Sequence, residues 1–378
     1  MDLNFTEEQQ MLQKTFADFF RKECNSEFVR RMEEEEKGFS EEMWQRMAAL
    51  GWLSLMLPEE YGGLNYGMIE LVILMEEVGS ACFPSPYLSS TLAAIAIAES
   101  GTAALKNDVL PKVTKGETIL STAFLEPGTR QYDPLLCDTQ YRVLGSEEQC
   151  EEFSISGCKL FVTDAHVSDY ILVSARLLGS SGISLFMIPG DAEGVSIIGL
   201  TTISGDKQFE VRLKDVKVRR TNLLGNPGQG EGILRKIHQM GALAKCAELV
   251  GMGSAITKMT VDYAKERNQF GQAIAKFQAV QHHCANMLID LDGSRYVTYK
   301  AAWLLDAGEV DHLGVVGAKG WVGDAVQRIA AMGHQIGAAT AYMSEHDMTL
   351  YSRRVKSADL AFGDAAYHRR KTAQILGF

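Results

Sequence analysis

The spacing of apolar residues changes twice along the 378-residue chain, and this pattern restricts the fold more than any other feature. In residues 1–116 the apolar side chains recur every three or four positions, as in "MIELVILMEEVG", which indicates helices. Residues 117–226 instead carry short β-rich runs such as "DYILVSARL", separated by Gly, Pro and Asp. Helical spacing returns in residues 227–378. We therefore expect an α+β multidomain protein with an N-terminal helical domain, a middle β-barrel-like domain and a C-terminal four-helix-bundle-like domain.

Charge and cysteine content exclude several classes of protein. The net charge of −11 argues against nucleic acid or an anionic membrane as the main partner. No apolar run is long enough to span a bilayer, and "MDLNFTEEQQMLQ" lacks a signal-peptide core. The seven cysteines show neither the close pairing of a zinc site nor the dense spacing of a disulfide framework. We expect a cytoplasmic protein with no metal site, no nucleic-acid partner and no membrane span.

The stretch "ERNQFGQAIAKFQAVQHH", residues 266–283, predicts a ligand site at a corner between two helices. We expect one long helix closed by Gly271 in a left-handed cap, and a second helix with Gln278 in its first turn. Arg267 and Phe270 are three residues apart, so both would project from one face of the first helix's last turn. A guanidinium, a ring and an amide suit a ligand with phosphate and an aromatic base. The alternative is structural, with Arg267 capping the helix, Phe270 in the core and Gln278 solvated.

Three further motifs precede this corner: "EEYGG" at residues 59–63, "FLEPG" at 124–128 and "GCKLFVT" at 157–163. With the R-x-x-F-G and F-Q elements of the corner and the order of domains, the chain resembles the acyl-CoA dehydrogenase family over nearly its whole length. The resemblance implies FAD as cofactor, an acyl-CoA thioester as substrate and an electron-transfer flavoprotein as electron acceptor. It also implies α,β-dehydrogenation, in which a carboxylate removes the C2 proton and the C3 hydride passes to the flavin.

The resemblance assigns roles to several residues. In the family the helix corner reaches across a subunit interface to the pyrophosphate and adenine of a neighbour's FAD, which implies a dimer of dimers. Phe161 would pack near the flavin ring, and Thr163 would hydrogen-bond to the ring or its phosphates. The alternative for Phe161 is a buried residue of an alternating strand.

A second family element contacts the neighbour's FAD, a Q-x-x-G-G-x-G turn whose glycines allow close approach of the backbone. Here Gln335 and Gly337 are retained, while Ala338, Ala339 and Ala341 replace later glycines. We expect the three methyl groups to crowd a ligand at this turn.

The usual catalytic glutamate is absent. Most family members place the base in a Y-E-G-T sequence that follows R-x-x-K, a spacing kept here by Arg353 and Lys356. Phe362 then falls on the glutamate and Asp364 on the threonine. A smaller set of members carries the base on the long helix, twenty-six residues before the arginine of the corner, where this chain has Gly241.

Two interpretations stay open at this point. In the first, the chain is an active enzyme, a homo-tetramer that uses a displaced carboxylate, either Asp364 or Glu248. Each acid could instead be solvated or cap a helix. In the second, the chain is a non-catalytic partner subunit of a hetero-oligomer, which keeps the fold and supplies part of the FAD site to a homologous subunit that owns the base.

Overall fold

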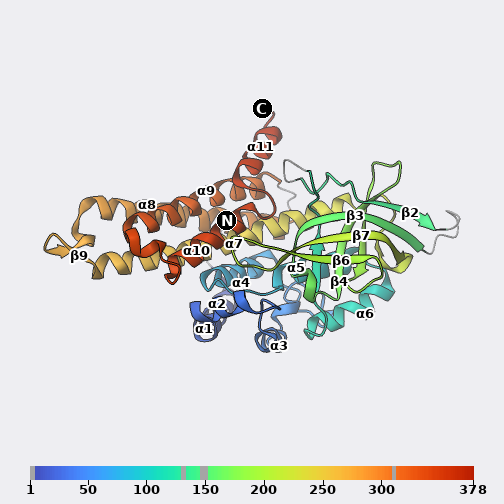
Figure 1. The fold of residues 1–378 in the computed structure, drawn as a ribbon, viewed down its shortest axis with the longest axis horizontal. Helices are drawn as coiled ribbons and strands as arrows, with labels where there is room; N and C mark the ends of the chain where they lie inside the picture. The colour runs from blue at the N-terminus through green and yellow to red at the C-terminus, as the bar shows by residue number, and fades with distance from the viewer. Residues whose placement is uncertain (1–4, 129–132, 145–151, 309–311) are drawn as a thin grey trace. The chain divides into compact units, whose positions relative to one another are not determined.

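The computed structural model has helices, then a β-sheet, then helices along the chain, which confirms the predicted order and fold class (Figure 1). It describes residues 5–128, 133–144, 152–308 and 312–378. Among the described strands no pairing closes the sheet into a barrel.

The N-terminal helices are set by caps and by apolar faces. Thr6 accepts a hydrogen bond from the Gln9 amide at 3.2 Å, and the Gln9 side chain accepts one from the Thr6 amide at 3.0 Å, so α1 begins with a reciprocal capping box. α5 is apolar on every side and is buried along most of its length. The elements are α1 Glu7–Glu23, α2 Ser26–Glu34, α3 Glu41–Ala49, η1 Trp52–Ser54, η2 Glu59–Tyr61, α4 Met68–Ser80, α5 Tyr87–Ser100 and α6 Ala103–Thr114.

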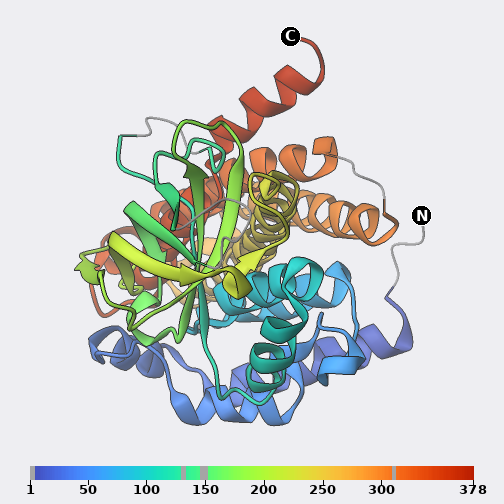
Figure 2. The ribbon, with the colours of Figure 1, turned by 90° about the vertical axis from the view of Figure 1, so that its right-hand side faces the viewer.

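The middle segment forms one twisted sheet with the strand order β6-β7-β3-β2-β4-β5-β8, and β1 pairs with β4 (Figures 1 and 2). Its core holds an edge-to-face aromatic cluster in which the rings of Tyr141, Phe153 and Phe186 lie 5.0–5.5 Å apart. The elements are β1 Leu120–Ala123, β2 Gln140–Leu144, β3 Glu152–Thr163, η4 Ala165–Val167, β4 Tyr170–Leu177, β5 Ile183–Pro189, β6 Val195–Leu200, β7 Gln208–Arg219, η5 Arg220–Asn222 and β8 Leu223–Leu224.

The C-terminal segment is a set of long helices, of which α8 and α9 pack against each other and α9 also contacts α10 and α11. The helix α11 projects beyond α9 and carries the C-terminus near its tip (Figures 1 and 2). The elements are α7 Glu231–Glu266, β9 Asn268–Gln269, β10 Gln272–Ala273, η6 Ile274–Lys276, α8 Gln278–Asp306, α9 His312–Gly337, η7 Ala338–Tyr342, α10 Asp347–Leu360 and α11 Ala365–Ile375.

The chain divides into two compact units, and neither is continuous in sequence. α1 and α4, from the N-terminal segment, belong to the same unit as the C-terminal helices. Each unit combines parts of more than one of the three expected segments, so the division into units does not test the expected domain boundaries, which stay a prediction. The first unit comprises Met1–Arg30, Met68–Phe83 and Ala242–Phe378; the second comprises Arg31–Gly67 and Pro84–Gly241.

Two glycines allow α4 and α7 to cross in direct backbone contact within the first unit. A Cβ added at Gly79 would lie 2.0 Å from the carbonyl oxygen of Glu248, and one added at Gly251 would lie 1.9 Å from that of Glu76. Real Cβ atoms do not approach that closely, so both positions require glycine. The crossing therefore joins residues about 170 positions apart in sequence with no side chain between the helices.

The described residues contain no helix that is both long and apolar enough to cross a bilayer. In the same residues no group of three or more His, Cys, Asp or Glu side chains is placed to hold a metal ion.

Candidate functional site

The corner between α7 and α8 is a short antiparallel hairpin, which corrects the expected helix end. α7 stops one residue before Arg267, and Gln269 pairs with Gln272. Phe270 and Gly271 are then the two turn residues, with φ of 53° and 79°. Positive φ at both central residues gives a turn whose twist matches that of the strands. Gly271 is left-handed, as expected, but it serves the hairpin and not a helix cap, and Phe270 is not part of the helix.

The side chains of this hairpin corner are exposed to solvent. Phe270 is 92% exposed, and its ring lies at right angles to that of Phe277 with centroids 6.1 Å apart. Gln278 is exposed at the first position of α8. The Arg267 guanidinium makes no hydrogen bond or ion pair with any of the described residues. The structure therefore gives no support to a helix-capping role for Arg267 or a core role for Phe270.

The turn after α9 is tight and partly exposed. A Cβ added at Gly337 would lie 2.6 Å from the Cβ of Ala341, so this position requires glycine. Gln335, Ala338 and Ala339 are exposed, whereas Ala341 is fully buried. Only two of the three alanine methyl groups can therefore meet a ligand, which corrects the expected crowding.

In the second unit, Phe161 lies at an irregularity of β3 and not in a regular alternating strand. The pairing of β3 with β7 shifts register between Lys159 and Val162, and Phe161 has a φ of 54°. Its side chain is 54% exposed, so the alternative of a buried strand residue is wrong. Thr163 ends the strand, and its carbonyl oxygen accepts a hydrogen bond from the Ser121 hydroxyl at 2.6 Å.

A buried ion pair supports the strand that carries Phe161. Lys159 and Glu126 form it with side chains that are 0% and 2% exposed. Lys159 also donates to the Ser174 hydroxyl at 3.0 Å, and the Thr139 amide donates to Glu126 at 3.1 Å. Burial alone would raise the pKa of Glu126, but the neighbouring ammonium and the hydrogen bonds outweigh it and hold the pKa below its ordinary value. The sequence analysis missed this pair, although Lys159 stands within β3 and Glu126 follows closely after the apolar β1.

Both candidate carboxylates have partners. Asp364 is the N-cap of α11 and accepts a hydrogen bond from the Tyr367 amide at 2.6 Å. Glu248 pairs with the Lys245 ammonium at 2.6 Å on α7. The other family position for a base, Gly241, is buried within the same helix. The contact of Asp364 matches the capping alternative, whereas Glu248 is neither solvated alone nor a cap but forms an ion pair within α7.

The turn that carries Phe362 is held firmly. Phe362 and Gly363 have φ of 56° and 92°, and the His368 ring donates from Nε2 to the Phe362 carbonyl oxygen at 2.9 Å. Burial lowers the pKa of His368 to about 4, so this ring is neutral at pH 7. On the other side, the buried Lys319 ammonium donates to the Asp359 carbonyl oxygen at 2.6 Å. The turn thus presents a half-buried phenyl ring at the position that the family resemblance assigns to the catalytic glutamate.

Three family profiles match the chain in the order of its segments. They are described as the acyl-CoA dehydrogenase N-terminal domain, over residues 6–117, the middle domain, over residues 122–216, and the C-terminal domain, over residues 228–377.

Individual proteins match over most of their length. The chain is 29% identical to a probable acyl-CoA dehydrogenase, YngJ, of Bacillus subtilis, and the match covers 100% of both chains. It is 29% identical to CarC, a caffeyl-CoA reductase–Etf complex subunit of Acetobacterium woodii, over 90% of this chain and 91% of CarC. Among solved structures it resembles a chain of the ChsE4–ChsE5 complex of Mycobacterium tuberculosis with a TM-score of 0.90 and 26% identity, over 100% of this chain and 99% of that chain.

Proposed function

The chain belongs to the acyl-CoA dehydrogenase family, and from this premise we propose that it is the non-catalytic partner subunit of a hetero-oligomeric, FAD-dependent acyl-CoA dehydrogenase. A homologous subunit supplies the base, and the electrons pass to an electron-transfer flavoprotein. The observation that carries the proposal is Phe362 on its firmly held turn. The similarity to CarC and to a chain of the ChsE4–ChsE5 complex supports partners of these two kinds.

The hairpin corner fits one end of FAD. Arg267 makes no ion pair with the described residues and can pair bidentately with a pyrophosphate, Phe270 offers an exposed ring to the adenine, and Gln278 offers an amide. In the second unit, the exposed ring of Phe161 and the nearby Thr163 suit the flavin end. When bound, FAD supplies the hydride acceptor of the reaction. Gln335 and Gly337 would join the adenine end, where two exposed methyl groups leave less room than glycines would.

The chain's own residues do not provide the base. Removal of a weakly acidic C2 proton requires a carboxylate within hydrogen-bond reach of the substrate, in a site with little water. The side chain of Phe362 has no proton-accepting atom, Asp364 is hydrogen-bonded to the start of α11, and Glu248 is paired with a lysine. The isolated chain should therefore bind acyl-CoA without dehydrogenating it.

The second candidate function is an acyl-CoA dehydrogenase that is active alone and uses Asp364. One observation favours it: Asp364 is half-buried and lies two residues from Phe362, directly after the fixed turn. Its carboxylate would have to remove a proton while it caps α11, or release the Tyr367 amide to do so.

A turnover assay separates the two functions. The wild-type chain and Asp364→Asn are assayed alone and after co-expression with a homologous subunit that carries the glutamate. Asparagine is also a good N-cap, so the variant should keep the helix start. We expect both isolated proteins to be inactive, and both co-expressed complexes to be yellow and bleached by acyl-CoA. Robust turnover by the isolated wild type that is lost in Asp364→Asn would instead establish Asp364 as the base.

The contribution of Arg267 to flavin binding is measured separately. Arg267→Ala should weaken FAD retention in the assembly roughly tenfold to a hundredfold, because a charge-assisted bond to phosphate contributes about 1.5–3 kcal/mol. Arg267→Lys keeps the charge without the bidentate geometry and should lie between the two. Lys276→Ala, at an exposed cation of the same corner, is the matched control. Unchanged flavin content together with a lower melting temperature would favour a structural role for Arg267.

A further inference from the structure

Two adjacent glutamates lie in a helix that is otherwise largely apolar. α4 is buried along most of its length and carries Glu76 and Glu77 near its C-terminal end. A carboxylate removed from water costs free energy unless hydrogen bonds or a cation replace the lost hydration. Neither residue takes part in the proposed reaction, so what they do is independent of it.

Glu76 is bonded on both oxygens by side chains of α8. The Arg295 Nε donates to its Oε1 at 2.9 Å, and the Tyr299 hydroxyl donates to its Oε2 at 2.8 Å. Arg295 and Tyr299 are four residues apart, so they lie on one face of α8. The Glu76 side chain is 9% exposed. These bonds hold α4 against α8 and occupy the guanidinium of Arg295.

Glu77, the next residue, has no such partner. It is half-buried, and its side chain makes no hydrogen bond or ion pair with any of the described residues. The two cations that act on it already have partners, since Arg295 bonds to Glu76 and Arg21 of α1 pairs with Asp18. Burial and the charge of Glu76 therefore raise the pKa of Glu77 to about 7. This carboxyl changes charge near neutral pH, which an exposed glutamate does not.

The charged groups that α7 and α10 bring to this end of α4 are also engaged. α7 brings Lys245 and Glu248, which pair with each other at 2.6 Å. α10 brings Arg354 and Tyr351, which donate to carbonyl oxygens at the end of α4 at 2.9 and 2.6 Å. α10 leads into the turn that carries Phe362, so two hydrogen bonds link α4 to the helix that precedes this turn.

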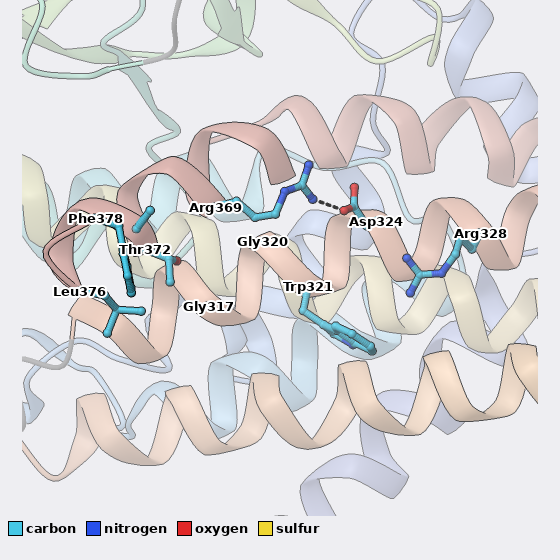
Figure 3. A pocket seen from close by; sticks show the side chains of 10 residues that line it. Gly317, Gly320, Trp321, Asp324, Arg328, Arg369, Thr372, Leu376 and Phe378 are labelled. Atoms are coloured by element: carbon cyan, nitrogen blue, oxygen red, sulfur yellow. Dashed lines mark hydrogen bonds and ion pairs between the residues drawn. The ribbon is translucent and has the colours of Figure 1, made fainter.

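Two ion pairs beside α9 are more exposed than this cluster. Arg369 faces Asp324 in the groove between α9 and α11, as Figure 3 shows, and their side chains are 54% and 44% exposed. Arg328 pairs with Asp290 at 2.7 Å, and its side chain is 50% exposed. Water solvates and screens such pairs, so their charges have little effect on how the helices pack. Glu77 differs because it shares a water-poor contact with an ionised neighbour.

We propose that protonation of Glu77 controls the contact between α4 and α8: the contact is tightest when this carboxyl is neutral, and its ionisation loosens it. When both glutamates are charged, they repel each other and compete for one guanidinium. The Glu77 carboxylate then regains its hydration by an outward movement of this end of α4. The same movement weakens the bonds of Glu76 to α8 and of the α4 carbonyl oxygens to α10.

The direction of the pH dependence separates Glu77 from the histidines. Its pKa is raised from 4.5 to about 7 in the folded chain, so the stability that it contributes is complete below about pH 4.5 and is lost as the pH rises through 7. Histidines with lowered pKa act in the opposite direction, because they destabilise the fold as the pH falls; they are His166, His334 and His368. Burial also raises the pKa of Asp306 and Asp359, so a substitution at Glu77 itself is needed to assign the effect.

The test compares the wild type with Glu77→Gln, whose amide has the shape of the neutral carboxyl. Glu27→Gln is the matched control, because Glu27 is an exposed glutamate of the same unit. The full chain is unfolded with urea at pH 6 and pH 8, at one protein concentration. The ratio of the unfolding equilibrium constant of the wild type to that of Glu77→Gln should rise about tenfold from pH 6 to pH 8, as a pKa of about 7 requires. The same ratio for Glu27→Gln should not change.

Hydrogen exchange locates the change in the structure. Between pH 6 and pH 8 the exchange of residues 68–80, corrected for the intrinsic rate, should increase in the wild type relative to Glu77→Gln. Because the amide cannot ionise, α4 should stay protected in this variant at both pH values.

Three results would overturn the proposal. The first is a ratio of wild type to Glu77→Gln that stays constant between pH 6 and pH 8. The second is an equal change of the ratio for Glu27→Gln, which would show that any lost acid has this effect. The third is a pH-dependent stability without a change in the exchange of residues 68–80, which would place the titrating contact outside α4.

Discussion

Replacing Lys159 with methionine should destabilise the β-sheet unit strongly, because it leaves the Glu126 carboxylate buried without its cation. The ammonium of Lys159 is fully buried and bonds both to Glu126 and to the Ser174 hydroxyl. Methionine fills a similar volume, so the change removes charge and hydrogen bonds with little change in packing. The two amides that donate to the carboxylate, from Asp138 and Thr139, stay in place.

The magnitude follows from the burial of the pair. With side chains 0% and 2% exposed, neither charge can recover its hydration from solvent. Removing one partner of such a pair typically costs about 3–5 kcal/mol, whereas replacing both by neutral groups is often close to neutral. We therefore expect Lys159→Met to lower the free energy of unfolding by about 4 kcal/mol, and Lys159→Met with Glu126→Gln to recover at least about 2 kcal/mol of it.

The assay is urea unfolding of the wild type, both single variants and the double variant, followed by far-UV circular dichroism. The pH dependence gives a second, independent reading. In the wild type the pKa of Glu126 is held below its ordinary value, so its contribution is present at neutral pH and is lost as the pH falls below about 4.5. In Lys159→Met burial is no longer offset and the pKa of Glu126 should rise, so acidification from neutral pH should stabilise this variant.

Two outcomes would refute this reasoning. One is a cost of less than about 1 kcal/mol for Lys159→Met, the range of an exposed ion pair. The other is a double variant whose loss equals the sum of the two single losses, since that would show that the two charges do not interact.

Three other changes test separate parts of the molecule. Phe362→Glu places a carboxylate on the fixed turn and should give acyl-CoA-dependent flavin bleaching in the isolated, flavin-loaded chain; no bleaching would contradict the account of the missing base. Gly251→Ala should lower the free energy of unfolding by about 3 kcal/mol, because its Cβ would lie 1.9 Å from the Glu76 carbonyl oxygen. Gly232→Ala, at a position of the same helix with open space around it, should leave the free energy of unfolding unchanged. Equal effects of the two substitutions would refute the close crossing. Burial lowers the pKa of His368 to about 4 from 6.5, so the stability that this residue contributes is complete above pH 6.5 and is lost as the pH falls towards 4. In His368→Gln the melting temperature should therefore change less with pH between 6.5 and 4 than in the wild type. Parallel plots of melting temperature against pH for the two proteins would contradict this.

The order of the segments could be predicted because it depends on local periodicity. Apolar residues spaced three and four apart indicate a helix with one buried face, and a spacing of two indicates a strand with one buried face. Neither inference requires knowing which elements pair. The hairpin corner could not be predicted in the same way. Two-residue hairpin turns usually carry Asn-Gly or Asp-Gly, and this one has Phe270 before Gly271, so the sequence resembles the end of a helix.

The sequence could single out side chains that act alone, whose ligand role stays a prediction, but it missed contacts between residues far apart in the chain. The exposure of Phe270 and Gln278 agrees with the ligand interpretation that their spacing suggested. Lys159 and Glu126 lie 33 positions apart, and their contact depends on the register of strands that the sequence does not state. The same applies to the crossing of Gly79 and Gly251, since each glycine by itself only weakens the expectation of a helix.

The discontinuity of the first unit has a consequence for how the protein is made. On a ribosome the chain emerges from its N-terminus, so all residues of the second unit, which ends at Gly241, are available while much of the first unit is still unsynthesised. α4 is made early and can pack on α1, but the helix that its Gly79 contacts comes about 170 residues later, and until then the largely apolar α4 lacks that partner. We expect nascent chains arrested after residue 241 to protect the β-sheet from protease and to leave α4 accessible. Chaperones that bind apolar segments should therefore act on this protein during translation, on residues 68–83, and release it only when α7 has been completed.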